Sequence, residues 1–351
     1  MRARFGLAVL AMALALFGCG PKPAASTGAA STSTESPQVQ LDPCAGKIKA
    51  LCVDSDLAPL SAKMKEALAD AASKVSADGA QLLAKGQRDW LEAQRIACGV
   101  GADGAALTAK QENCLKAALA ARVKDAKDAV ERLGPFTFQR MEINQSDPVV
   151  ETAAAQALGA AAPNVITRDI KFPRIDGDTP AIRKFNEAVK QSPRFKAIDQ
   201  TEEQVTYKIA YAGPDLVSVR FDLYDLGLGA ANPETTVRTV NFNMTTGAPL
   251  TANDVFAPNT RWADFLTRRA LADLTAQLRA EDETAQAPSP DYVRKALTAP
   301  DHWLVTNDAL VIVFSPLDLG SAGAGTHEVS VPWRDLKPYL NPRGPGPIKN
   351  A

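Results

Sequence analysis

The stretch GQRDWLEAQRIAC, Gly86–Cys98, decides the fold of the N-terminal part of the chain. Its apolar residues recur at helical spacing, so it predicts a helix over about residues 80–97 with Trp90 and Leu91 turned inward. The same spacing predicts a helix before it, over 57–75, and another after it, over 107–130. A buried tryptophan would supply a large share of such a small core. We therefore expect a helical domain over residues 42–134.

Four cysteines lie in this helical part of the chain: Cys44, Cys52, Cys98 and Cys114. Their spacings lack the close C-x₂-C pairs of structural zinc sites, so no metal is expected. In an exported protein they would form two disulfides, of which three pairings are possible. An antiparallel hairpin of the first two helices would bring Cys52 close to Cys98, but spacing alone leaves the pairing open.

The N-terminus, MRARFGLAVLAMALALFGCG, has the layout of a signal peptide over residues 1–18. It resembles a bacterial lipoprotein signal, which implies that Cys19 is acylated and anchors the chain to a membrane. Residues 19–41 are rich in Ala, Ser, Thr and Pro and predict a flexible tether. The expected location is the cell envelope, facing the periplasm or the cell surface, with the outer membrane favoured by Gly20.

The charge of the chain is nearly balanced, with 39 basic and 40 acidic residues. Loss of Arg2 and Arg4 with the signal peptide would make the mature chain slightly more acidic. A nucleic-acid partner is therefore not expected, because it would require a basic face.

The cysteine-bearing part resembles the LprI-type domain of bacterial envelope lipoproteins. The similar segments are PCAGKIKALCVDSDLAPLSAKMKEAL, QRDWLEAQRIACG and CLKAALAARV, which together span roughly residues 42–133. The family includes a lysozyme inhibitor, so the resemblance implies a lysozyme partner. The matching positions, beside the four cysteines, are Leu51, Asp56, Gln87, Arg88, Trp90, Leu91, Arg95, Leu115 and Arg122.

Arg88 and Arg95 are the candidate interaction residues of this domain. They are seven residues apart, which places both on one face of a helix, where they could clamp carboxylates. Solvated surface charge is the plainer alternative.

Beyond residue 163 the pattern changes from helical to alternating, which predicts a mixed domain over 164–343 with an antiparallel sheet and packed helices. Residues 135–163 are expected to be a connector, and 344–351 a tail. The fold class is thus α+β in two domains. The expected strands are 165–172, 203–211, 216–223, 236–244, 303–305, 309–314 and 326–332, and the expected helices are 179–191 and 262–279.

This second part resembles the RsiV-type envelope domain over about residues 165–340. The resemblance is carried by GAANPETTVRTVNFNMTTGAPLTANDVF and DALVIVFSPLDLGSAGAGTHEVSVPWRDLKPYL. The family occurs in a membrane anti-sigma factor whose outer part binds lysozyme, so the implied ligand is the same. Asn232 replaces a common histidine and Leu317 a common tyrosine, which would alter a shared binding mode.

No catalytic constellation is recognisable, so we expect no enzyme and no cofactor. The two histidines, His302 and His327, are not in a zinc-binding H-E-x-x-H, and Ser315 lacks the G-x-S-x-G setting of hydrolases. The chain also has no phosphate-binding G-x-x-x-x-G-K-[ST].

The expected function is therefore a lipid-anchored envelope protein that binds and inhibits lysozyme. The alternative is an envelope sensor or assembly lipoprotein that recognises peptidoglycan or a protein partner. The loops 226–233 and 315–326 are the expected contact segments, and their candidate residues are Gly229, Asn232, Asp318 and His327.

Overall fold

The computed structural model describes residues 41–101, 106–191, 197–319 and 325–350, all within a compact unit, Ser36–Ala351. The signal peptide, Cys19 and nearly all of the tether lie outside the described residues. None of the described helices has both the length and the hydropathy of a membrane span.

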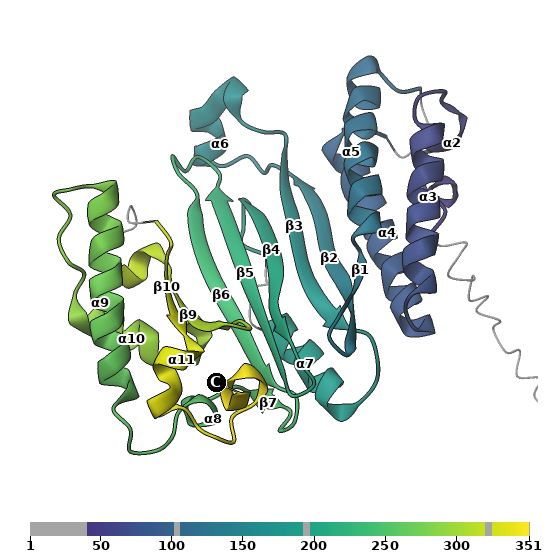
Figure 1. The fold of residues 1–351 in the computed structure, drawn as a ribbon. Helices are drawn as coiled ribbons and strands as arrows, with labels where there is room; N and C mark the ends of the chain where they lie inside the picture. Colours follow the sequence, from purple (N-terminus) through teal and green to yellow (C-terminus); the bar gives the residue numbers. More distant parts are fainter. Residues whose placement is uncertain (1–40, 102–105, 192–196, 320–324, 351) are drawn as a thin grey trace, which may run out of the picture. The chain divides into compact units, whose positions relative to one another are not determined.

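The fold is α+β, as the alternation of patterns predicts (Figure 1). A seven-stranded sheet has the order β1-β2-β3-β4-β5-β6-β7, and a three-stranded sheet has the order β10-β9-β8. All neighbours are antiparallel except β3 and β4. The strands are β1 (Val130–Leu133), β2 (Phe136–Pro148), β3 (Val165–Ile175), β4 (Thr201–Ala212), β5 (Leu216–Gly227), β6 (Glu234–Asn243), β7 (Ala248–Pro249), β8 (Trp303–Val305), β9 (Ala309–Phe314) and β10 (His327–Pro332).

The helical region consists mainly of α3 (Ala58–Ser73), α4 (Ala77–Ala97) and α5 (Ala109–Lys127), with the short α2 (Ala50–Val53) before them. Side chains satisfy the free amides at the helix starts, because Ser76 caps α4 and Thr108 forms a capping box on α5. The inward face holds one apolar core that includes Trp90, as its spacing predicts.

The two disulfides join cysteines that are neighbours in sequence, Cys44 to Cys52 and Cys98 to Cys114. The first closes the loop that leads into α3, and the second ties the end of α4 to the first turns of α5. The hairpin of α3 and α4 therefore does not bond Cys52 to Cys98.

The segment expected to be a connector contains a principal strand instead. Strand β2 occupies its first half, and the alanine-rich α6 (Ala153–Leu158) and a short 3-10 helix (Gly159–Ala161) precede β3. The sequence of β2 lacks the usual strand alternation of apolar and polar residues, because β2 buries polar side chains. Gln139, for example, is fully buried and donates to the backbone carbonyl of Gly79 in α4. The third helix also ends earlier than expected, and β1 pairs with β2 through a tight turn at Gly134.

One face of the seven-stranded sheet is covered by α7 (Pro180–Gln191), whose Ile182, Phe185 and Val189 enter a core with apolar residues of β3 to β6. A second core lies among α9 (Trp262–Glu281), α10 (Pro290–Thr298) and the three-stranded sheet. The helix α10 is not among the sequence predictions. The remaining short helices are α8 (Ala252–Val255) and α11 (Trp333–Leu336).

Candidate functional site

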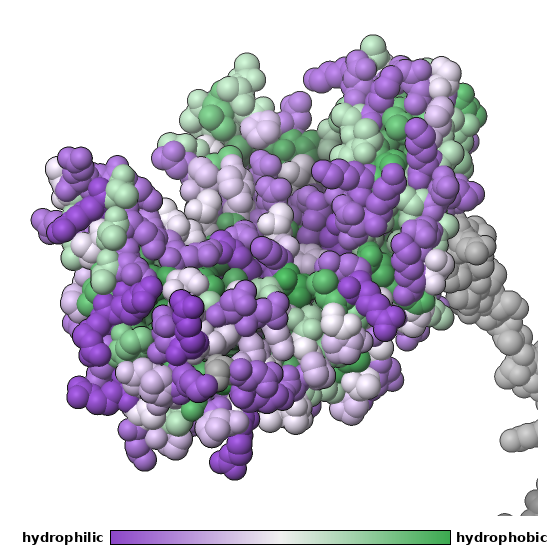
Figure 2. Space-filling view, viewed as in Figure 1, coloured by the Kyte–Doolittle hydropathy of each residue, from purple (hydrophilic) through white to green (hydrophobic). Residues whose placement is uncertain are grey.

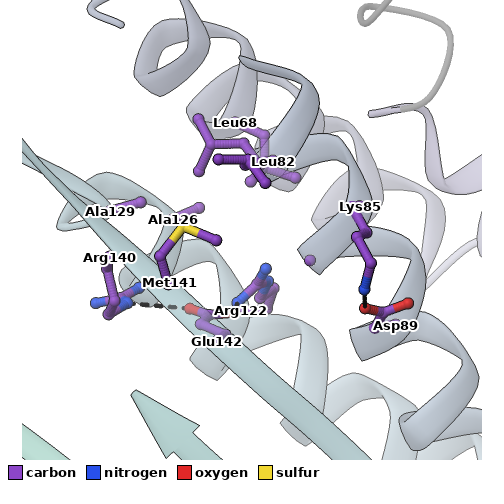
Figure 3. Close-up of a pocket in the computed structure, with 12 residues that line it drawn as sticks. Leu68, Leu82, Lys85, Asp89, Arg122, Ala126, Ala129, Arg140, Met141 and Glu142 are labelled. Carbon is purple, nitrogen blue, oxygen red and sulfur yellow. Dashed lines mark hydrogen bonds and ion pairs between the residues drawn. The ribbon is translucent and has the colours of Figure 1, made fainter. Parts of the chain in front are cut away.

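A buried polar cluster joins the helical region to the sheet, and we call it the polar junction: Gln87, Trp90, Arg122, Arg140 and Glu142. Figure 3 shows Arg122, Arg140 and Glu142 of this cluster. The Nε of Arg122 donates to Gln87 Oε1 at 3.0 Å, and its guanidinium lies 5.3 Å from the centre of the Trp90 ring. Its Nη1 pairs with Glu142 of β2, whose other oxygen accepts from Arg140 at 3.0 Å. Gln87 and Trp90 of the opening stretch therefore serve the interior of the protein.

The charges of this junction are well compensated. Burial would raise the pKa of Glu142, but the positive charges of Arg122 and Arg140, with their hydrogen bonds, outweigh it and hold the pKa below its ordinary value. A cavity of only about 50 Å³ adjoins the cluster. Because the charged atoms are already paired with one another, the junction has a structural character.

Arg88 and Arg95 do share one face of α4, and both line an open groove of about 510 Å³ between α4 and the disulfide-closed loop. Arg95 is already committed, since it donates twice to Glu92 and once to the carbonyl oxygen of Val100. Its hydrogen bonds, with those of Lys47, hold the pKa of Glu92 at about 2 against the opposing effect of burial. A two-arginine clamp for external carboxylates is therefore not preformed in this groove.

Gly229 and Asn232 lie in the loop between β5 and β6, where residues 229–235 are all exposed. Gly229 adopts a left-handed backbone with φ of 81°, which favours glycine at this position. The base of the loop is fixed, because the amide of Leu228 donates to the carbonyl oxygen of Gln200 and that of Ala230 to Gly227. The loop therefore presents an exposed tip on an ordered base.

Carboxylates surround the base of this loop. Asp225 and Glu234 are register partners at the ends of β5 and β6, and Glu202 of β4 lies opposite Leu226. Glu202 and Glu234 are exposed. The loop thus leaves the sheet at an acidic end, which is the arrangement expected for steering a cationic partner.

Asp318 and His327 have internal roles. Asp318 accepts a hydrogen bond from the Ser315 amide at 2.7 Å and lies 3.5 Å from His302 Nδ1. His327 is only 5% exposed, and its Nδ1 lies 3.2 Å from Gln277 Oε1. These two side chains stabilise the C-terminal part. Residues 320–324 of the expected contact segment 315–326 lie outside the described residues.

The hydroxyl of Ser315 is also used within the fold. Its Oγ accepts from the backbone amide of Val237 at 3.2 Å, on strand β6. This contact anchors the end of β9 to the large sheet. Among the residues that the structure describes, no group of His, Cys, Asp and Glu is arranged to hold a metal ion.

Sequence reasoning missed the partners of Arg122. Arg140 and Glu142 fall in the segment expected to be a connector, and alternating charged residues there resemble a solvated stretch. The available signal was Arg122 itself, an arginine on the inward side of a helix that requires a buried acid.

The architecture defines the class as an α+β protein with a disulfide-bonded helical region. Residues 253–334 match the family model described as "Protein of unknown function (DUF3298)". No curated protein matches the chain.

Two crystal structures are similar to this chain at 13% identity and a TM-score of 0.41 each. One is a member of the DUF3298 family from Bacteroides fragilis NCTC 9343, with 60% of this chain and 96% of that one covered. The other is a DUF3298 family protein from Pseudomonas aeruginosa PAO1, with 60% and 98% covered.

Proposed function

We propose that this chain is a lipid-anchored envelope protein that binds lysozyme and blocks its cleft. The observation that carries the proposal is the exposed loop 229–233 at the acidic end of the sheet, with Glu202 and Glu234 beside its base. Its motivation is that both parts of the sequence resemble families with lysozyme-binding members. The disulfides suit an oxidising compartment, as an envelope location requires.

In this proposal the acidic groups attract lysozyme, and the loop blocks its cleft. Lysozyme is a cationic enzyme whose cleft contains paired catalytic carboxylates. Exposed acidic groups raise the rate of encounter with a cationic partner, whereas affinity depends on a closely fitting, preorganised segment. Asn232 and Gly229 at the loop tip would enter the cleft without adding a second set of negative charges to it.

The test is a turbidity assay of lysozyme on cell-wall suspensions with soluble Ser36–Ala351, together with calorimetry of the complex. We expect inhibition at stoichiometric ratios. The double variant Glu202→Lys/Glu234→Lys should slow association and weaken inhibition, most clearly at low salt. The control Glu187→Lys reverses an exposed charge on α7. Absence of both inhibition and binding at excess protein would refute the function, and equal loss in both variants would refute the assigned surface.

A further inference from the structure

On the side opposite α7, the centre of the large sheet has a polar face whose strand β4 residues no other described element covers. β4 is the fourth of seven strands, and its Val205 enters the core beneath α7, so Gln204, Thr206 and Lys208 face the other way. All three are exposed. Register places them beside residues of β3 and β5 to form what we call the β3–β5 face: Thr167, Asp169, Lys171, Gln204, Thr206, Lys208, Arg220, Asp222 and Tyr224.

Other elements are joined to this face along both sides. On one side Lys171 pairs with Asp125 of α5 at 3.2 Å, and on the other Arg220 pairs with Glu328 of β10. The strip between them is three strands wide, which corresponds to roughly 10 Å across and about 13 Å along the strands. Figure 2 shows mainly hydrophilic side chains over the sheet between β6 and the helices α4 and α5. The face is therefore large enough to hold a short, extended ligand.

Most charges on the face are matched locally. Lys171 also pairs with Asp169 at 3.2 Å, and Arg220 also pairs with Asp222 at 2.8 Å. The pKa of each of these two basic groups is raised: burial opposes the rise, and the neighbouring carboxylates outweigh it. The face thus has fixed polar groups but little net charge, which disfavours both strongly anionic and strongly cationic ligands.

The remaining groups on the face are suited to hydroxyl and amide partners. The Gln204 amide can donate and accept, and the Thr206 hydroxyl does the same. Tyr224, half-buried and directly opposite Gln204, adds an aromatic ring with a polar tip to this otherwise hydrophilic strip.

We infer that the β3–β5 face binds an uncharged oligosaccharide, whose hydroxyl and acetamido groups would bond to Gln204 and Thr206 while a sugar ring lies against Tyr224. The ligand class follows from the balance of charge and from the mixture of donors, acceptors and one aromatic ring. The site adjoins the base of the loop proposed to block lysozyme, and it does not require lysozyme for its function.

The test is titration of Ser36–Ala351 with tetra-N-acetylchitotetraose, without lysozyme, followed by calorimetry and by NMR amide shifts. We expect saturable binding with shifts clustered on β3 to β5, and at least a tenfold loss of affinity in Tyr224→Ala and in Gln204→Ala. The control Tyr292→Ala removes an exposed tyrosine on α10 and should bind as the parent protein does.

Three outcomes would overturn the inference: no saturable binding by the parent protein, equal affinity of Tyr224→Ala and Tyr292→Ala, or equal binding of a uronic-acid oligosaccharide of the same length. Circular dichroism would confirm that each variant is folded. Retained lysozyme inhibition by Tyr224→Ala would separate this site from the proposed inhibitory loop.

Discussion

Replacing Arg122 by methionine tests the polar junction directly. Arg122 and Glu142 are both almost fully buried, with side chains 5% and 6% exposed. Removing one member of a buried ion pair costs about 3–5 kcal/mol. Because Glu142 keeps Arg140 as a partner, we expect the lower end, about 3 kcal/mol of unfolding free energy, with the lost Trp90 contact included.

The measurement is urea unfolding followed by tryptophan fluorescence and circular dichroism, in a double-mutant cycle with Glu142→Gln. We expect a coupling of about 1–3 kcal/mol between the two positions. The matched control is Lys124→Met, at an exposed position of the same helix, which should change stability by less than about 0.5 kcal/mol. A cost below about 1 kcal/mol for Arg122→Met, or a double variant that equals the sum of the singles, would contradict a coupled buried cluster.

Three further predictions concern the helical region and its attachment. Replacing Cys98 and Cys114 by serine should cost about 3 kcal/mol, since this disulfide closes a 16-residue separation; thermal unfolding that matches the parent would contradict it. Gly134→Ala should destabilise the protein by more than about 2 kcal/mol in urea unfolding. The reason is that φ of Gly134 is 55° and a Cβ there would lie 2.0 Å from the carbonyl oxygen of Ala212. A neutral effect would show that the β1–β2 turn relaxes. Burial would raise the pKa of Asp176, but hydrogen bonds from Ser76 and the pairing with Arg174 outweigh it and lower the pKa. The contribution of Asp176 to the free energy of unfolding is therefore present above its unfolded pKa of about 3.9 and is lost as the pH falls through the folded pKa. Asp176→Asn should flatten the loss of stability at acid pH, and an unchanged pH dependence would contradict the assignment.

Periodicity was sufficient where one face of an element is apolar and the other polar. The helices α4 and α7, the hairpin of β4 and β5, and that of β8 and β9 lie close to their expected positions. The alternation that predicts β4 also places its exposed polar residues on one face of the sheet, since Glu202, Gln204, Thr206 and Lys208 are all exposed.

Periodicity failed where polar side chains are buried by partners distant in sequence. Because Gln139 and Glu142 are polar, the sequence of β2 predicts an irregular segment. Their contacts with Gly79 and Arg122 explain how a strand forms there. The candidate site shows the same limit. The exposed loop at Gly229 follows from local sequence, whereas the inward setting of His327 depends on α9, whose Gln277 it contacts.

The nearest-neighbour connectivity of the disulfides has a consequence for how the protein is made. Synthesis delivers Cys44, Cys52, Cys98 and Cys114 in that order, and each bond joins a cysteine to the next one. With Cys19 acylated, as the N-terminal sequence predicts, oxidation in order of appearance would yield the native pairing without any reshuffling of bonds. Maturation then needs an oxidant for these thiols, and no isomerase to correct them.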